Sequence, residues 1–363
     1  MAELAAELAR QGCDVIYVAE QMMSAEREEQ GWLAPNLGAA RLEFAITEAD
    51  VVALVDNASV DSIHICQGIR SNGLVGIAQR CLAHREIRQW VVMETVDDSG
   101  WQGVLKRIEY WRQFTIWKGK LEGVLATGNR TLDWVIARGM PVTKVFSFAY
   151  FLSVDHALIK KEQEVAGRCR LVFVGQLIEL KRLDLLIKAI ASLNRNDCEL
   201  EVIGSGVEDT ELRILADRVL PGRVAWTGCI PMGEVAQHMA KADCLVLPSR
   251  HDGWGAVVSE ALLVGTPAIC SDRCGSAGVV SESGYGGVFC SGDEGALAGL
   301  IEQVIDRERL SSGERSALAG WAESLAVEAG AKYLRAILNH AEGHGEKPIV
   351  PWEENKKVMI PDA

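Results

Sequence analysis

Two Rossmann-like halves, each an α/β unit with a parallel sheet, are the fold that this sequence predicts. Short apolar runs of four to six residues alternate with longer stretches of helical period, a pattern typical of βαβ units. This alternation of predicted strands and helices begins again after residue 150, and a length of 363 residues suits two domains better than one. We therefore expect one domain over residues 1–150, a second over residues 151–341 and a tail over residues 342–363.

The first half opens on MAELAAELARQG, which predicts an amphipathic helix where a Rossmann half normally opens on a strand and a Gly-rich turn. Either a first strand is missing or the N-terminal sheet is built differently. Apolar runs predict strands at Val15–Ala19, Ser62–Cys66, Trp90–Met93, Val124–Thr127 and Lys144–Phe148. The two halves are expected to join near Ala149–Ala157.

The second half repeats the same alternation. Strands are predicted at Arg170–Gly175, Glu199–Gly204, Arg223–Trp226, Cys244–Leu247, Ala268–Ser271 and Gly287–Phe289. Helices are predicted at Lys181–Asn194, Asp209–Val219, Gly233–Lys241 and Ala326–Ala341. The tail is rich in Pro and charge and predicts either a docking segment or disorder.

Composition excludes several classes of function. A net charge of -13 without a basic run opposes binding to nucleic acid. The ten cysteines form no C-x-x-C pair, which predicts reduced thiols in a cytoplasmic protein and no zinc site. No 18-residue apolar run predicts a membrane span, and no signal peptide is expected. Because no D-x-D sequence occurs, we expect neither a required metal nor another cofactor.

The strongest motif is SRHDGWGAVVSEAL, residues 249–262, which follows the apolar run CLVLP. A helix that begins near Gly255 would direct its free N–H groups and its positive dipole end at an anion such as phosphate. Asp252 and Glu260 lie about two helical turns apart and could accept hydrogen bonds from sugar hydroxyls. The same spacing also occurs on solvated helix faces, so the motif alone leaves both interpretations open.

This motif resembles the E-x7-E signature of the family-4 retaining glycosyltransferases, which have the GT-B fold. The resemblance implies that Asp252, in place of the usual first Glu, contacts the donor sugar and that Glu260 binds the ribose hydroxyls. The segment FVGQLIELKR, residues 173–182, resembles the family's strand, G-R-L turn and K-G pair. It implies that Lys181 neutralises the donor diphosphate, with Gln176 replacing the usual Arg and Arg182 the usual Gly.

Three weaker matches follow. The first is EVIGSG, residues 201–206, which resembles the family's strand and G-x-G turn. The second is WTGCIP, residues 226–231, which resembles the segment that lines the nucleotide base. The third is CGSAG, residues 274–278, which resembles a loop that meets donor sugar and phosphate. The resemblance implies three catalytic residues, Lys181, Asp252 and Glu260. The implied donor-binding residues are Gly175, Gln176, Arg182, Gly204, Gly206, Thr227, Gly228, Gly253, Trp254 and Gly255.

In the first half, Gln67 and Gly68 follow the strand SIHIC, and Glu94 follows WVVM. Polar residues at the carboxyl ends of strands line the cleft of a doubly wound sheet, so these three are acceptor-side candidates. Glu94 also begins an acidic stretch with Asp97 and Asp98 that would equally suit a solvated loop.

The resemblance implies two parallel sheets facing across a cleft and retaining transfer from a nucleotide-diphosphate sugar to a hydroxyl acceptor, in cell-surface polysaccharide or glycolipid assembly. The acceptor class includes lipid-linked saccharides, so peripheral contact with the inner membrane face is expected for the family. A GT-B-fold sugar-nucleotide epimerase and an inactive, nucleotide-sugar-sensing protein are the alternatives. The absence of a G-x-G-x-x-G turn disfavours a nicotinamide dehydrogenase.

Overall fold

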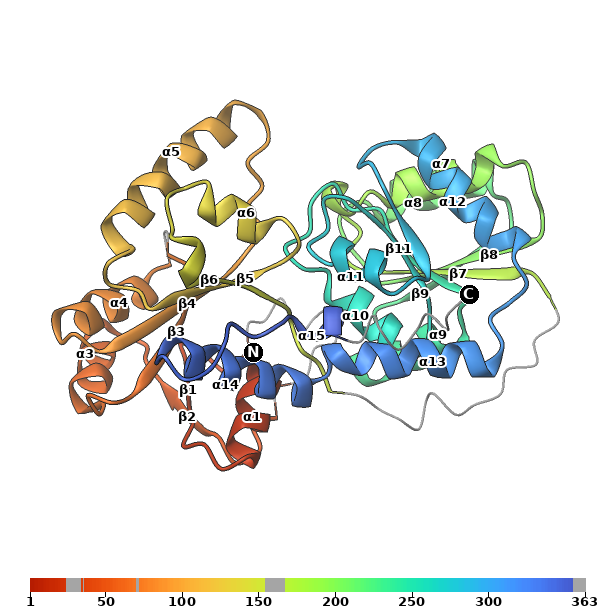
Figure 1. Ribbon diagram of the computed structural model, residues 1–363. Helices are drawn as coiled ribbons and strands as arrows, with labels where there is room; N and C mark the ends of the chain where they lie inside the picture. The colour runs from red at the N-terminus through yellow and green to blue at the C-terminus, as the bar shows by residue number, and fades with distance from the viewer. Residues whose placement is uncertain (24–33, 35, 70–71, 154–166, 355–363) are drawn as a thin grey trace. The chain divides into compact units, whose positions relative to one another are not determined.

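The computed structural model describes residues 1–23, 34, 36–69, 72–153 and 167–354 (Figure 1). The chain divides into two compact units. Unit 1 comprises Met1–Met22, Pro35–Tyr150 and Gly330–Val350, and unit 2 is built mainly from Phe151–Ala329, with the residues from Pro351 onward. The expected junction at Ala149–Ala157 spans this boundary, and its residues beyond 153 lie outside the described part.

Unit 1 contains a four-stranded parallel sheet in the order β3-β4-β5-β6. Its strands are β3 (Ile63–Gln67), β4 (Arg88–Glu94), β5 (Gly123–Thr127) and β6 (Val145–Phe148). Its helices are α3 (Glu48–Asn57), α4 (Leu74–His84), α5 (Gly100–Trp117), α6 (Thr131–Ile136) and the 3-10 turn η1 (Val142–Lys144). The predicted strands of this sheet are confirmed; the apolar residues of β4, β5 and β6 are buried, whereas β3 is mostly half-buried.

The N-terminal part of unit 1 is built separately. Helix α1 (Ala2–Arg10) is followed by β1 (Ile16–Ala19), which pairs in parallel only with β2 (Arg41–Phe44) among the described strands. The predicted first helix and the strand after it are therefore confirmed. β2 was not predicted, because RLEF is too short and too polar to form an apolar run.

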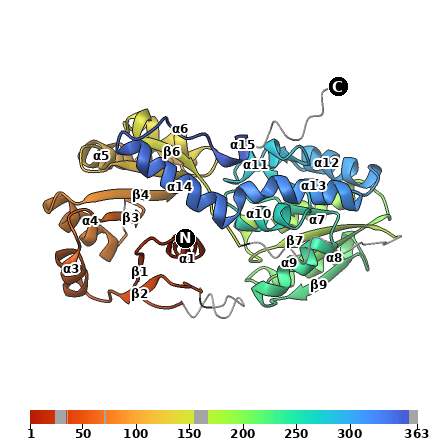
Figure 2. The same ribbon diagram turned by 60° about the horizontal axis from the view of Figure 1, so that its bottom comes forward.

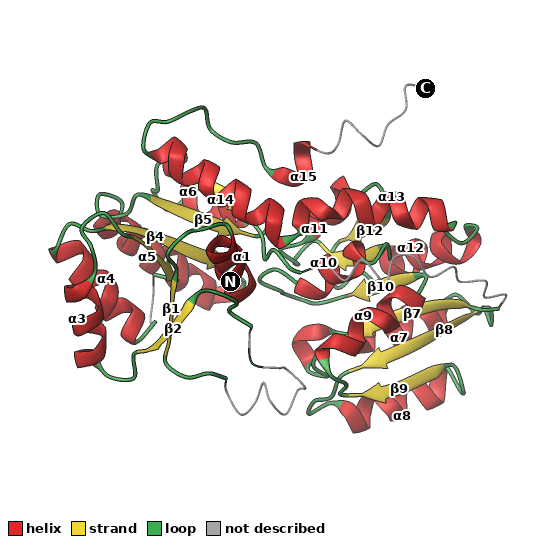
Figure 3. Ribbon diagram, turned by 90° about the horizontal axis from the view of Figure 1, so that it is seen from below, coloured by secondary structure: helices red, strands yellow, loops and turns green. Residues whose placement is uncertain are grey.

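Unit 2 contains a six-stranded parallel sheet in the order β12-β11-β10-β7-β8-β9. Figure 3 shows the strands β10, β7, β8 and β9 of this sheet lengthwise. Its strands are β7 (Cys169–Val174), β8 (Cys198–Ile203), β9 (Val224–Gly228), β10 (Cys244–Leu247), β11 (Ala268–Ser271) and β12 (Gly286–Phe289). Its helices are α7 (Leu183–Ser192), α8 (Asp209–Val219), α9 (Met232–Lys241), α10 (Ala256–Leu263), α11 (Ala277–Glu282), α12 (Glu294–Asp306) and α13 (Ser312–Ala322), with 3-10 turns η2 (Glu179–Lys181) and η3 (Glu323–Leu325).

Helices cover both faces of this sheet. Helices α7, α8 and α12 lie on one face, and α9, α10 and α13 on the other (Figure 1). A strand covered on both faces carries apolar residues at every position, and all four residues of β10 are buried. This is why β10 was readable as an uninterrupted apolar run, whereas β8 (CELEVI) alternates buried apolar residues with two half-buried glutamates.

Two predicted boundaries are wrong. The helix expected over Lys181–Asn194 is interrupted, because Arg182 adopts a left-handed conformation with φ +55° between η2 and α7. The second domain was expected to extend to residue 341, but Gly330–Val350 belongs to unit 1. Within that segment, the Tyr333 hydroxyl of α14 (Val327–Ala341) donates a 3.0 Å hydrogen bond to the Ser147 carbonyl, and Figure 2 shows α14 along β6.

Candidate functional site

The chain reverses its direction of sheet growth at β7. It passes from β7 outward to β8 and β9, and then returns to place β10 on the other side of β7, with Leu171 opposite Cys244. In open α/β sheets, ligands bind in the crevice outside the carboxyl ends of the strands at such a switch point. The loops after β7 and β10 therefore frame the candidate site of unit 2.

These two loops are joined by an ion pair. The Lys181 Nζ lies 2.5 Å from Asp252 Oδ2, and the two side chains are only 21% and 14% exposed. Nearby, the backbone N–H of Arg250 donates a 2.8 Å hydrogen bond to the Leu180 carbonyl, which fixes the loops relative to each other. The structure thus brings together a predicted phosphate-binding lysine and a predicted sugar-binding carboxylate that are 71 positions apart.

Helix α10 starts beside this ion pair. Gly255, its N-terminal cap, has φ +84°, and a Cβ there would lie 2.9 Å from Leu247 Cδ2. Only glycine adopts this conformation readily, so the residue allows the chain to turn sharply into the helix. The first N–H groups of a helix lack intrahelical partners and attract anions. Glu260 lies on α10, one turn before its end, and is half-buried.

The loop after β11 supports the loop after β10. The N–H of Gly275 donates to the Asp252 carbonyl at 3.0 Å, and the N–H of Ser276 donates to the Trp254 carbonyl at 2.8 Å. The two backbones pass so closely that a Cβ on Gly275 would lie 2.0 Å from the Gly253 carbonyl oxygen. The predicted CGSAG loop therefore lies at the site, next to Gly253, Trp254 and Gly255.

Two buried hydroxyls at these loops were missed by the sequence analysis. Ser249 and Ser276 are both fully buried, and their Oγ atoms have no hydrogen-bond partner among the described residues. Leaving a buried polar atom unpaired costs about 1–3 kcal/mol, so such atoms call for an explanation. Ser249 belongs to the motif of residues 249–262 and Ser276 to that of residues 274–278. Nothing in the sequence distinguishes a buried serine without a hydrogen-bond partner from an ordinary turn serine.

The glycine turns after β7 and β8 pack against each other. The N–H of Gly175 donates to the Ile203 carbonyl at 3.0 Å, and that of Gly204 donates to the Gly228 carbonyl at 2.9 Å. A Cβ on Gly206 would lie 2.3 Å from the Leu177 carbonyl oxygen. Both turns therefore require glycine for close approach, and they place Gln176 at the same edge of the sheet.

Thr227, near the end of β9, uses its hydroxyl within the protein. It donates a 2.7 Å hydrogen bond to Glu201 Oε1, and His238 Nδ1 lies 2.8 Å from the same oxygen. One carboxylate oxygen of Glu201 thus joins β8, β9 and α9, and the Thr227 hydroxyl is engaged in this network.

Arg182 points to a different place from Lys181. Its Nε donates a 2.9 Å hydrogen bond to Asp184 Oδ1, an interaction that raises the pKa of Arg182 above its ordinary value. The pair lines a shallow hollow that also contains three glutamates: Glu179, Glu208 and Glu211. The guanidinium is therefore held in acidic surroundings and does not join the Lys181–Asp252 ion pair.

The acceptor-side candidates lie at the carboxyl edge of the unit 1 sheet. Gln67 ends β3 and Glu94 ends the neighbouring β4. Gly68, with φ +73°, donates its N–H to the Val92 carbonyl at 2.8 Å, and the Tyr150 hydroxyl donates to Glu94 Oε1. The three predicted residues thus share one sheet edge in unit 1.

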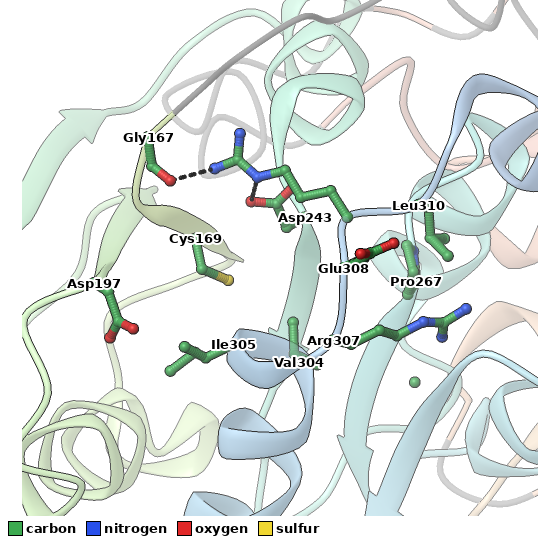
Figure 4. A pocket seen from close by; sticks show the side chains of 12 residues that line it. Gly167, Cys169, Asp197, Asp243, Pro267, Val304, Ile305, Arg307, Glu308 and Leu310 are labelled. Atoms are coloured by element: carbon green, nitrogen blue, oxygen red, sulfur yellow. Dashed lines mark hydrogen bonds and ion pairs between the residues drawn. The ribbon is translucent and has the colours of Figure 1, made fainter.

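A further hollow of about 250 Å³ lies at the opposite, amino edge of the unit 2 sheet (Figure 4). Inside it, Arg309 Nε lies 3.3 Å from Asp243 Oδ2, and Arg309 also donates to the Gly167 carbonyl at 3.2 Å. Asp243 in turn accepts the N–H of Arg170 at 2.8 Å. This network ties the strand starts together, at the edge away from the switch point.

No group of three or more His, Cys, Asp or Glu side chains suited to hold a metal ion occurs within the described ranges. Every helix in the described part of the chain is too short or too polar to span a bilayer.

Trp352 of the tail also reaches the site loops. It lies in the short helix α15 (Pro351–Glu354), where it is buried, and its ring centroid is 6.3 Å from that of Trp254 and 6.4 Å from that of Phe151. The tail is therefore a docking segment up to Glu354, one of the two expected outcomes, and its remaining residues lie outside the described part. The tryptophan, in a tail rich in Pro and charge, was the sequence feature that could have indicated this docking.

We expect Trp352→Ala to destabilise unit 2 by about 3 kcal/mol, because it removes a large buried side chain from behind the DGWG loop. Thermal unfolding followed by circular dichroism measures the change. Trp101→Ala is the matched control, since Trp101 is 72% exposed and its loss should change stability by less than about 0.5 kcal/mol. Equal melting temperatures for both variants would contradict the docking of Trp352.

The chain is similar to known proteins in both sequence and fold. Residues 155–317 match the family glycosyl transferases group 1. Over 170 residues the chain is 32% identical to D-inositol 3-phosphate glycosyltransferase of Frankia alni, a match that covers 42% of each protein. The chain thus matches less than half the length of this curated relative.

Two solved structures are similar over most of their length. The lipopolysaccharide outer core galactosyltransferase WaaB in its apo form has a TM-score of 0.69 at 17% identity, with 94% of each chain covered. Anabaena Alr3699/HepE in complex with UDP has a TM-score of 0.70 at 16% identity, with 90% of this chain and 100% of that chain covered. The predicted fold is confirmed: the protein has the GT-B fold, with two Rossmann-like units that each contain a parallel sheet.

Proposed function

Because unit 2 carries the group 1 glycosyltransferase match, we propose that the protein is a retaining, family-4 type glycosyltransferase that uses a nucleotide-diphosphate sugar. The observation that carries this proposal is the Lys181–Asp252 ion pair at the β7/β10 switch point, beside the start of α10. Support for the donor class comes from HepE, whose structure contains UDP.

In this proposal, unit 2 stabilises the leaving diphosphate. Negative charge grows on the departing phosphate during glycosyl transfer, so fixed positive groups and N–H donors aimed at it lower the barrier. Lys181 supplies a cation and the start of α10 supplies N–H groups and its dipole. No metal ion is required for this charge stabilisation.

Donor binding would rearrange the ion pair. A diphosphate competes with Asp252 for the Lys181 ammonium, and a carboxylate released in this way can accept hydrogen bonds from the hydroxyls of the donor sugar. Glu260 would bind the ribose hydroxyls. The acceptor hydroxyl would attack on the face from which the phosphate leaves, and the leaving phosphate would take its proton, so that no protein nucleophile is needed.

The acceptor would be a saccharide or glycolipid hydroxyl, contacted by Gln67, Gly68 and Glu94. The name of one similar protein, the lipopolysaccharide outer core galactosyltransferase, indicates such an acceptor, and that of another indicates a polyol phosphate, D-inositol 3-phosphate. We place the reaction in the cytoplasm, in the assembly of cell-surface polysaccharide or glycolipid.

A thermal-shift panel of UDP-, GDP- and ADP-sugars tests the donor site. A ligand present at 100 times its Kd adds about 2.7 kcal/mol to the stability of the folded state, so one nucleotide class should raise the melting temperature. Glu260→Ala should abolish the shift, whereas Glu302→Ala, at an exposed position of α12, should retain it. No shift with any donor would contradict the proposal, and a shift without acceptor-dependent release of nucleoside diphosphate would indicate a sensing protein.

A further inference from the structure

A diphosphate at the β7/β10 switch point carries more negative charge than Lys181 can balance. A diphosphate has more than one negative charge at neutral pH, whereas Lys181 is a single cation. Its Nζ lies 2.5 Å from Asp252 Oδ2, and a displaced Asp252 carboxylate stays in the same loop, where it still offsets part of the lysine charge. Stabilisation of a departing diphosphate therefore calls for a second cation at this edge of the sheet.

The two basic residues that follow Lys181 in the chain are engaged elsewhere. Arg182 Nε donates to Asp184 Oδ1 at 2.9 Å, and Lys188 Nζ donates to Asp184 Oδ2 at 2.9 Å. Arg182 and Asp184 line a hollow that also contains Glu208 and Glu211. These carboxylates would repel a diphosphate that approached Arg182. The second cation must therefore come from another segment.

Arg250, in the loop after β10, is placed beside Lys181 by the pairing of the two loops. The backbone N–H of Arg250 donates a 2.8 Å hydrogen bond to the carbonyl of Leu180, the residue before Lys181. Two positions after Arg250, Asp252 forms the ion pair with Lys181 itself. The backbones that carry the two basic residues thus lie against each other at the carboxyl edge of β7 and β10.

The present partner of the Arg250 guanidinium holds it only weakly. Arg250 Nη1 lies 2.9 Å from Glu179 Oε1, and the two side chains are 53% and 74% exposed. An ion pair that is open to water contributes little, because the solvent screens both charges. A guanidinium that donates two parallel N–H bonds to a phosphate makes one of the stronger charge-assisted contacts. Exchange of Glu179 for a phosphate is therefore favourable.

We propose that Arg250 leaves Glu179 when the donor binds and becomes the second cation on its diphosphate, beside Lys181. This inference rests on the proposed glycosyltransferase function and adds a catalytic residue to it. The planar guanidinium offers a fork of N–H donors that an ammonium does not have, so the two residues are not interchangeable. A positive group held on the departing phosphate lowers the barrier to transfer. Glu179 keeps the guanidinium beside the site while no donor is bound.

Calorimetric titration of the purified chain with UDP, GDP and ADP tests this inference. For the nucleotide that the parent chain binds, Arg250→Ala should weaken the affinity by about 10–100-fold, the effect of losing a charge-assisted hydrogen bond. Arg250→Lys should lose less, because it keeps the charge. Arg307→Ala is the matched control and should bind like the parent. Arg307 pairs with Glu314 at 3.4 Å and is 47% exposed, but it lies at the opposite, amino edge of the sheet (Figure 4).

Glu179→Ala separates phosphate binding from a merely structural role of the Arg250–Glu179 pair. It breaks the same ion pair but keeps the guanidinium, so its affinity for the nucleotide should equal or exceed that of the parent chain. Both positions are exposed, and the melting temperatures without nucleotide should therefore stay unchanged. Release of nucleoside diphosphate in the presence of acceptor should follow the same order of variants.

Three results would overturn the inference. Unchanged affinity in Arg250→Ala would overturn it alone and leave the proposed function standing. An equal loss in Glu179→Ala and Arg250→Ala would show that the pair only fixes the two loops. Binding of none of the three nucleotides by the parent chain would overturn the proposed function together with the inference.

Discussion

Lys181→Ala is expected to lower kcat for glycosyl transfer by about 10²–10³-fold, the effect of removing one preorganised charge-stabilising group from a transition state. Lys181 lies at the switch point of the sheet, where it can neutralise a leaving diphosphate, and it pairs with the Asp252 carboxylate, which the donor would displace. Release of nucleoside diphosphate in the presence of acceptor measures the change. Folding should be preserved, because the side chain is at the surface of the site and not in the core.

Two variants sharpen this test. Lys241→Ala, at the exposed end of α9, removes the same charge away from the switch point and should leave kcat unchanged. Lys181→Arg keeps the charge but not the geometry of the ammonium, so partial activity is expected. A kcat for Lys181→Ala within threefold of the parent chain would show that the diphosphate is stabilised elsewhere.

Gly204→Ala is expected to destabilise unit 2 by about 3 kcal/mol or more, the range of substitutions that force a backbone clash at a special φ angle. Gly204 has φ +136°, and an added Cβ would lie 2.0 Å from the Gly175 carbonyl oxygen. Since both atoms belong to backbone that is fixed by the sheet, neither turn can move aside cheaply. Thermal unfolding and the yield of folded protein measure the loss.

Gly228→Ala is the matched control for that experiment. Gly228 also has a positive φ, +75°, but no atom lies within 4 Å of the position that a Cβ would occupy. Its substitution should cost only the conformational penalty of about 1–2 kcal/mol. If both variants melt at the same temperature, the contact between the two glycine turns contributes nothing to stability.

The central strand β10 of unit 2 was predictable because a strand covered on both faces is apolar at every position, and β8 was predictable from apolar residues at alternating positions. The turn into α10 was predictable from Gly255 and the helix that follows it, and phosphate binding there stays a prediction. The Lys181–Asp252 contact was not predictable, because side chains from separate loops meet only through the order of the strands. The pairing of Arg182 with Asp184 was not predicted either, because the left-handed φ of Arg182 is not visible in the sequence.

Helix α5 shows a different limit. An amphipathic helix is recognised in a sequence by its single apolar face, but α5 has apolar residues on both its packed side and its exposed side. Its apolar residues therefore fit neither the helical nor the strand period cleanly. Only burial separates Phe114, which belongs to the core, from Ile116, which does not.

Unit 1 is assembled from segments that lie far apart in the sequence, and this affects how the chain folds as it is synthesised. Its segment Gly330–Val350 includes most of α14, whose Tyr333 ring stacks on Phe148 and whose His340 ring meets Phe146. Ribosomal synthesis delivers β6 nearly 200 residues before this helix, so the sheet of unit 1 is translated long before the segment that completes the unit. During that interval the aromatic side chains of β6 lack their contacts with Tyr333 and His340, and we expect the nascent N-terminal unit to be prone to aggregation until α14 emerges.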